Sequence, residues 1–148
     1  MRLPVFARKP VPPAPPEDAA LRFIVITEDE PFYTRLRGIA DGCQWRIGRA
    51  QSIDEIQKQI GRPPTPIVIY ERDLAGGDWR AGLMKLHQTT IKPCVLLASR
   101  VADEYLWQEV VRNHGYDILP KTAPDEKLIR LLKFAWFWAR SGVHPNAG

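Results

Sequence analysis

Short apolar runs alternate along this chain with longer segments in which hydrophobic residues recur at helical spacing. The short runs predict five strands, at residues 21–26, 44–48, 66–70, 93–98 and 117–119. The first, third and fourth runs are apolar at nearly every position, as in strands that are covered on both faces. In the second run Arg46 lies between Trp45 and Ile47, which is typical of an edge strand.

The segments between these runs predict five helices, at about residues 31–42, 53–60, 79–87, 102–114 and 125–140. Pro31 suits the first turn of a helix, and Asp78 can cap the third helix. Ser52 and Glu55 have the spacing of a capping box. Strands that alternate with helices indicate an α/β fold, with a parallel sheet, right-handed crossovers and helices on both faces.

The composition divides the chain into a folded part and two tails. Residues 1–20 hold six prolines and predict a disordered, proline-rich tail, in which residues 8–13 could also serve as a polyproline ligand. A folded domain is expected over residues 21–141, followed by a flexible C-terminal tail over 142–148. We expect no signal peptide before the domain and no DNA-binding or catalytic domain after it.

Charge and cysteine content exclude several classes of function. The 148 residues carry a net charge of +4, with no block of basic residues interleaved with aromatics, so no nucleic-acid partner is expected. No apolar run reaches the length that spans a membrane, and a cytoplasmic protein is predicted. Cys43 and Cys94 lack metal-binding spacing and are interpreted as buried, reduced thiols.

Charged residues follow the first, third and fifth predicted strands. They are Glu28, Asp29, Glu30, Glu71, Asp73 and Lys121. Because the carboxyl ends of parallel strands meet at one edge of a sheet, the acids after the first strand, Glu71 and Lys121 are expected to converge there, and a backbone carbonyl near Asp73 could add a ligand. Carboxylate oxygens suit Mg²⁺, and crowded carboxylates need a cation among them, either a metal ion, the lysine or both. Each acid alone could be a helix-start residue and the lysine could be solvated, but together they favour a site.

The chain from about Arg22 to Trp138 resembles the receiver domains of two-component response regulators. The matching segments are residues 27–31 (TEDEP), 67–76 (IVIYERDLAG), 93–99 (PCVLLAS) and 115–121 (GYDILPK). The resemblance implies a flavodoxin-like, doubly wound sheet of five parallel strands in the order 2-1-3-4-5, with five helices. It places Glu28 and Asp29, with Asp73 nearby, at the positions of a weak Mg²⁺ site, and Lys121 at the pocket lysine.

This chain departs from the family at the positions of phosphoryl chemistry. Glu71 stands where the family has its phosphoacceptor aspartate, and Ala98 stands at the switch hydroxyl, although Ser99 is adjacent. The aromatic partner of that switch falls at Ile118. We therefore interpret the chain as a stand-alone pseudo-receiver rather than an enzyme, in which a permanent Glu71–Lys121 pair imitates part of the phosphorylated state. The alternatives are a working phosphoreceiver that uses Glu71 or Asp73, and a flavodoxin-like ligand-binding protein.

The resemblance also implies a signalling face built by the fourth and fifth helices and the strand between them. In this chain that region holds Tyr105, Trp107, Phe134, Trp136, Phe137 and Trp138. One helical stripe cannot bury all the aromatics of the last helix, so some are expected to face outward or to cover the helix end. Two interpretations of these aromatic residues are equally favoured. They could form a binding face for a histidine kinase, a downstream signalling protein or a second copy of the chain, or they could pack under the proline-rich tail.

Overall fold

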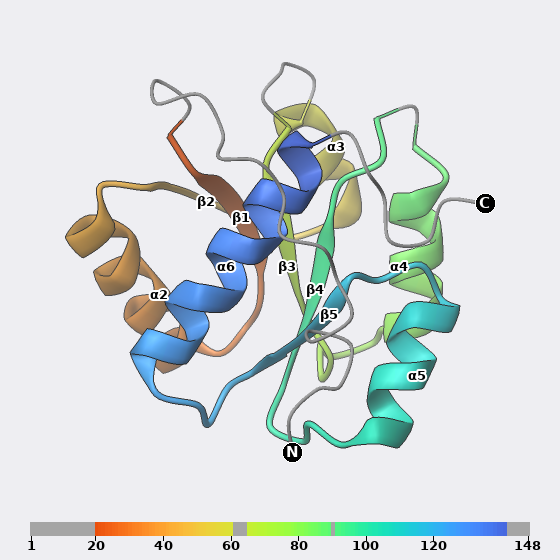
Figure 1. The fold of residues 1–148 in the computed structure, drawn as a ribbon. Helices are drawn as coiled ribbons and strands as arrows, with labels where there is room; N and C mark the ends of the chain where they lie inside the picture. The colour runs from red at the N-terminus through yellow and green to blue at the C-terminus, as the bar shows by residue number, and fades with distance from the viewer. Residues whose placement is uncertain (1–19, 61–64, 90, 142–148) are drawn as a thin grey trace.

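A single parallel sheet forms the centre of the molecule. The computed structural model describes residues 20–60, 65–89 and 91–141. Five strands lie in the order β2-β1-β3-β4-β5, and every neighbouring pair is parallel (Figure 1). The strands are β1 (Arg22–Ile26), β2 (Arg46–Ala50), β3 (Ile67–Glu71), β4 (Val95–Ser99) and β5 (Asp117–Pro120). The predicted α/β class and the strand order 2-1-3-4-5 are thus confirmed, whereas both predicted tails fall largely outside the described residues.

Helices cover both faces of this sheet (Figure 1). They are α2 (Glu30–Cys43), α3 (Ile53–Gln59), α4 (Trp79–His87), α5 (Glu104–Arg112) and α6 (Asp125–Arg140). Helices α2 and α6 pack on one face, and α3, α4 and α5 pack on the other, so each face has its own hydrophobic core. This layering leaves the carboxyl ends of the strands free to form a site along one rim.

Local capping sets the helix bounds where these differ from the prediction. Helix α5 begins after Asp103, whose side chain accepts a hydrogen bond from the backbone N–H of Leu106 at 2.8 Å. It ends before His114, which adopts a φ of 71°. Similarly, Gln44 ends α2 with a φ of 61°, so β2 starts at Arg46 and not at residue 44. The bounds of α6 match the prediction.

Burial along the strands follows the predicted pattern. Every residue of β3 and β4 is buried, whereas β2 is largely half-exposed, as expected for an edge. Cys43 and Cys94 are not joined in a disulfide, and both are only half-buried, because they lie near element ends and not in the core. Within the described parts of the chain, no helix is both long and apolar enough to cross a bilayer.

Candidate functional site

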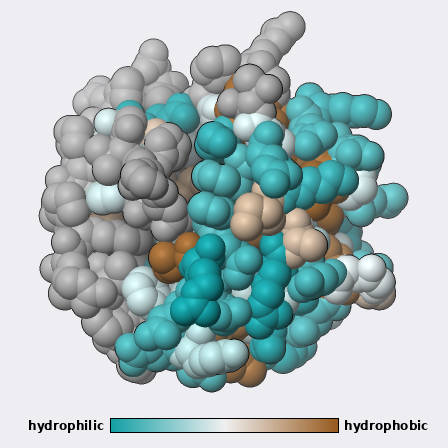
Figure 2. Space-filling model, turned by 90° about the vertical axis from the view of Figure 1, so that its right-hand side faces the viewer, coloured by the Kyte–Doolittle hydropathy of each residue, from teal (hydrophilic) through white to brown (hydrophobic). Residues whose placement is uncertain are grey.

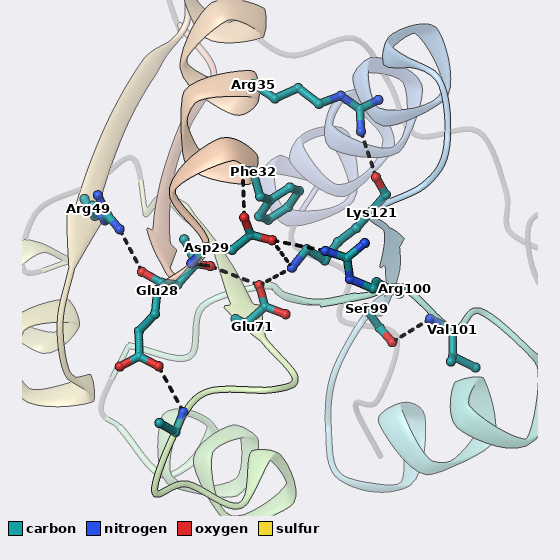
Figure 3. A network of polar contacts seen from close by, with 12 residues as sticks. Glu28, Asp29, Phe32, Arg35, Arg49, Glu71, Ser99, Arg100, Val101 and Lys121 are labelled. Atoms are coloured by element: carbon teal, nitrogen blue, oxygen red, sulfur yellow. Dashed lines mark hydrogen bonds and ion pairs between the residues drawn. The ribbon is translucent and has the colours of Figure 1, made fainter.

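Polar side chains from three strand ends meet around Lys121, as the rim argument predicted (Figure 3). The Lys121 Nζ lies 2.8 Å from Glu71 Oε1 and 2.6 Å from Asp29 Oδ2. Glu71 is the last residue of β3, Asp29 follows β1, and Lys121 follows β5. We call this cluster the rim pocket and define it as Thr27, Asp29, Glu71, Arg100 and Lys121.

Glu71 fills the floor of the rim pocket and is only 4% exposed. Its Oε1 accepts hydrogen bonds from Lys121 Nζ and, at 2.9 Å, from Thr27 Oγ1. The Thr27 hydroxyl in turn accepts from the backbone N–H of Asp29 at 3.0 Å, which links the β1 loop to β3. The Oε2 atom of Glu71 is buried and has no hydrogen-bond partner among the described residues. One oxygen of this carboxylate therefore carries all of its polar contacts.

Asp29 has two roles that use different oxygens. Its Oδ1 caps α2 by accepting from the backbone N–H of Phe32 at 3.1 Å. Its Oδ2 faces Lys121 and also lies 3.9 Å from an Nη of Arg100. The hydrogen bond from Lys121 lowers the pKa of Asp29 and, with help from the Phe32 N–H, outweighs the opposing effect of burial. The carboxylate is thus held in its charged form.

Lys121 is positioned by contacts at its ammonium group and at its backbone. Burial alone would lower its pKa, but hydrogen bonds to Asp29 and Glu71 outweigh burial and raise it. The Nζ also lies 4.9 Å from the centre of the Phe32 ring, a cation–π contact. At the backbone, Arg35 Nη1 donates to the Lys121 carbonyl at 2.8 Å, and Lys121 N–H donates to the Ser99 carbonyl at 2.9 Å. The ammonium is therefore a fixed part of the pocket.

Two of the acids predicted for a metal site do not reach the rim pocket. Glu28 is exposed, and its Oε1 accepts from the backbone N–H of Ala75 at 3.1 Å, on the side away from Lys121 (Figure 3). Asp73 is exposed in the turn beyond β3. Glu28 therefore does not join Asp29 in the rim pocket, because a loop amide binds it. Asp73 lies two residues past the end of β3, a position from which its side chain is expected to point out of the pocket. Across residues 20–60, 65–89 and 91–141, no three His, Cys, Asp or Glu residues form a metal-binding group.

The switch positions lack a hydroxyl that faces the rim pocket. Ala98 pairs with Glu71 in the β3–β4 register and is fully buried. Successive residues of a strand point to opposite faces, so Ser99 faces away, and its Oγ accepts from the backbone N–H of Val101 at 3.1 Å (Figure 3). Ile118 is fully buried in the core beneath α3, α4 and α5. Ser99 and Ile118 therefore supply no switch group to the rim pocket.

The aromatic residues of α5 and α6 divide into exposed and buried groups. Tyr105 is 70% exposed and Phe134 is 40% exposed, whereas Trp107 and Phe137 are half-buried. Placing Trp136 and Trp138 on an exposed face is wrong, because both pack into the core beneath α2 and α6. Seen from the side of α4 and α5, the described surface is mainly hydrophilic with small scattered apolar areas (Figure 2). No broad apolar face is visible on that side of the described chain.

An open groove of about 680 Å³ lies beside the rim pocket, over the ends of β1, β2 and β3. Its residues include Thr27, Glu28, Glu30, Arg49 and Tyr70. Arg49 forms an ion pair with Glu30 and donates to the Thr27 carbonyl at 3.0 Å. The loop after β1 thus presents carboxylates to the groove, which does not favour the phosphate group of a flavin-like ligand.

Three positioning residues were not identified from the sequence: Thr27, Arg35 and Arg100. Arg100 directly follows the end of β4, so the rim argument could have included it. Thr27 directly follows β1, next to the acids, and could have been found in the same way. Arg35 carries no such signal, because its contact with the Lys121 backbone joins residues 86 apart in sequence.

Comparison with known proteins identifies the fold. No protein-family model and no curated protein matches the chain. A signal receiver domain of an HD domain-containing protein from Pseudomonas fluorescens Pf-5 matches with a TM-score of 0.70 at 18% identity, covering 83% of this chain and 91% of that one.

Two further receiver domains of known structure match the chain. The receiver domain of a sensor histidine kinase from Pseudomonas aeruginosa PAO1, with a magnesium ion in its active-site cleft, matches with a TM-score of 0.66 at 12% identity, covering 80% of this chain and 98% of that one. The beryllofluoride-activated NtrC4 receiver domain dimer matches with a TM-score of 0.68 at 16% identity, covering 80% and 98%. The chain has the fold of response-regulator receiver domains.

The rim pocket does not fit the magnesium ion that this fold implies. Mg²⁺ requires nearly octahedral coordination by oxygen atoms and binds through one or two carboxylates with several waters. Here the facing oxygens of Asp29 and Glu71 are both taken by Lys121, and the second Asp29 oxygen caps α2. Glu28 and Asp73 lie outside the pocket. Only Glu71 Oε2 remains without a partner among the described residues.

Proposed function

We propose that the chain is a receiver-like module of two-component signal transduction that acts through protein contacts and whose pocket is fixed in one state by its own side chains. The observation that carries this proposal is the bonding of Lys121 to Glu71 and Asp29, at 2.8 and 2.6 Å. The module is proposed to be cytoplasmic and to have no catalytic activity of its own.

The side chains at the acceptor position support a fixed state. Glutamate is one methylene longer than aspartate, so the Glu71 carboxylate extends towards the place that a phosphoryl group on an aspartate would occupy. It carries one negative charge, against roughly two for a phosphate ester. Its buried pairing with Lys121 supplies part of the contact that phosphorylation would create. Because Ala98 offers no hydroxyl beside it, the remaining switch contact cannot form.

The partner proposed for this module is a protein. The candidate surface is formed by α5, β5 and α6, where Tyr105 and Phe134 are the exposed aromatics. Exposed aromatic side chains are enriched at protein interfaces, where they supply large contact areas. A histidine kinase, a downstream signalling protein and a second copy of the chain are the candidates for this surface. Trp136 and Trp138 do not contribute to it directly, since they are buried in the core.

Intact-mass measurement after incubation with acetyl phosphate and Mg²⁺ tests the proposal. An ordinary receiver domain is the positive control, and the Glu71→Asp variant restores the acceptor side chain. We expect no mass gain in the wild-type protein under conditions that label the positive control. Labelling of Glu71→Asp alone would show that the glutamate is what blocks the reaction.

A single-phosphate adduct on the wild-type protein would overturn the fixed-state proposal. The Asp73→Ala variant then identifies the acceptor. Loss of the adduct in that variant would assign the chemistry to Asp73, which is exposed beside the pocket. Persistence of the adduct in Asp73→Ala and its loss in Glu71→Gln would assign it to Glu71.

A further inference from the structure

We infer that Lys121 and Arg100 together take the place of a divalent metal ion in the rim pocket, so that the arrangement and stability of this site do not depend on Mg²⁺. The inference concerns the cation alone and does not require the proposed signalling role. It also gives a role in the site to Arg100, which is not among the site residues predicted from the sequence.

The charges in the rim pocket balance without a metal. Asp29 and Glu71 contribute two negative charges, and Lys121 and Arg100 contribute two positive charges. Of the other acids of the rim, Glu30 pairs with Arg49, Glu28 binds the Ala75 amide, and Asp73 is exposed in the turn beyond β3. A divalent ion added to this set would leave an uncompensated charge of about +2 in a partly buried site, which is unfavourable.

Lys121 occupies the position between the two carboxylates. Its Nζ contacts the facing oxygen of each carboxylate, at 2.6 and 2.8 Å, and thereby bridges β1 and β3 as a bound metal ion would. Its side chain is 8% exposed and that of Glu71 is 5% exposed, so water competes weakly for this pair. A metal ion can take the place of the Lys121 ammonium group only if the lysine side chain leaves the Phe32 ring and both carboxylates.

Arg100 is the weaker and more adjustable of the two cations. Its side chain is 70% exposed, and its guanidinium lies 3.9 Å from Asp29 Oδ2 at the mouth of the rim pocket. The positive charge of an exposed arginine at this position repels an approaching divalent ion. Lys121 is therefore expected to carry most of the effect and Arg100 the smaller share.

Thermal unfolding with and without Mg²⁺ tests the inference. Melting temperatures are compared in MgCl2 and in EDTA at matched ionic strength for the wild-type protein, Lys121→Met, Arg100→Met and Lys133→Met. Lys133 is an exposed lysine of α6 and serves as the control for the loss of one positive charge. Direct binding is measured with Mn²⁺ by its paramagnetic signal, because Mn²⁺ takes similar oxygen ligands.

The wild-type melting temperature is expected to be the same in MgCl2 and EDTA, with no Mn²⁺ bound. Lys121→Met should melt at a lower temperature in EDTA, regain part of the loss in MgCl2 and bind Mn²⁺. Arg100→Met should show a smaller response of the same sign, and Lys133→Met none. Since none of these measurements involves phosphorylation or a partner, they can fail independently of the proposed function.

Three results would overturn the inference. A rise in the wild-type melting temperature with Mg²⁺, together with Mn²⁺ binding, would show that the pocket accepts a metal despite its lysine. A folded Lys121→Met variant that ignores Mg²⁺ would show that the lysine does not substitute for the ion. If Lys121→Met does not fold, the Mg²⁺ response of the wild-type protein and of Arg100→Met tests the inference instead. An Arg100→Met protein whose melting temperature does not respond to Mg²⁺ would then count against the proposal that these side chains take the place of the ion.

Discussion

The rim pocket and the groove beside it lie at the same edge of the same sheet and share Thr27, yet their ion pairs differ in environment. In the rim pocket, the side chains of Lys121 and Glu71 are 8% and 5% exposed. In the groove, those of Arg49 and Glu30 are 29% and 67% exposed. Exposed pairs are screened by water and salt and typically contribute under about 1 kcal/mol, whereas breaking a buried pair can cost several. The burial of an ion pair, and not its presence alone, therefore determines how much it contributes to stability.

The groove is instead shaped by close packing beneath it. Tyr70 lines the groove from β3, and its ring lies against the backbone of Gly82 in α4. A Cβ atom at Gly82 would lie 2.4 Å from the Tyr70 hydroxyl oxygen and 2.5 Å from the ring carbon that bears it. Only glycine lets the Tyr70 ring lie this close to the backbone of α4. The groove therefore depends on close packing, whereas the rim pocket depends on charge.

Gly82→Ala is therefore expected to have the largest effect of the changes considered for the two regions. The added methyl group must displace the buried Tyr70 ring, at a cost of about 2–3 kcal/mol. Gly38→Ala is the matched control, because Gly38 lies within α2 with nothing within 4 Å of the added atom. It should stabilise the protein by up to about 1 kcal/mol through the helix propensity of alanine. Urea unfolding measures both, and equal effects of the two changes would contradict the packing argument.

Glu71→Gln compared with Glu30→Gln tests the charge side of the comparison. Glutamine keeps the shape of the side chain and one acceptor for Thr27 and Lys121 but removes the charge. We expect a loss of about 1.5 kcal/mol for Glu71→Gln, as is usual for a hydrogen bond to a charged group. Glu30→Gln should change stability by less than about 0.5 kcal/mol, because its pair is exposed. An unchanged stability and unchanged partner binding in Glu71→Gln would argue strongly against a Glu71–Lys121 pair that fixes the state.

Most of the fold could be predicted from the sequence because local patterns and sheet topology agree. Apolar runs located the strands, and the rule that parallel strands end at one edge brought Asp29, Glu71 and Lys121 together correctly. The same rule could not tell that Glu28 turns away, because the backbone amide that it binds belongs to the loop after β3. Side-chain direction depends on such tertiary partners, which sequence spacing does not encode.

The aromatic residues of α6 show a second limit of sequence reasoning. A single stripe of about 100° predicts which positions face the core, but α6 packs in a core that also includes α2 and buries a wider arc. Trp136 and Trp138 therefore become core residues, while Phe134 stays 40% exposed. The width of the buried arc is set by the neighbouring helix and cannot be read from the periodicity of α6 alone.

The acid limb of the stability curve gives the smallest expected effect and tests how far the rim pocket acts as a charged unit. The hydrogen bond from Lys121 lowers the pKa of Asp29 in the folded protein. A group with a lowered folded pKa contributes stability that is fully present above its unfolded pKa, about 4 for aspartate, and is lost as the pH falls through the folded value.

Asp29→Asn should therefore flatten the fall of stability below that pH, measured by urea unfolding at a series of pH values. Asp73→Asn, at an exposed aspartate of the same rim, should leave the slope unchanged. Equal flattening by both changes would mean that Lys121 does not distinguish the half-buried carboxylate of Asp29 from the exposed one of Asp73, and the contrast between pocket and surface would then be lost.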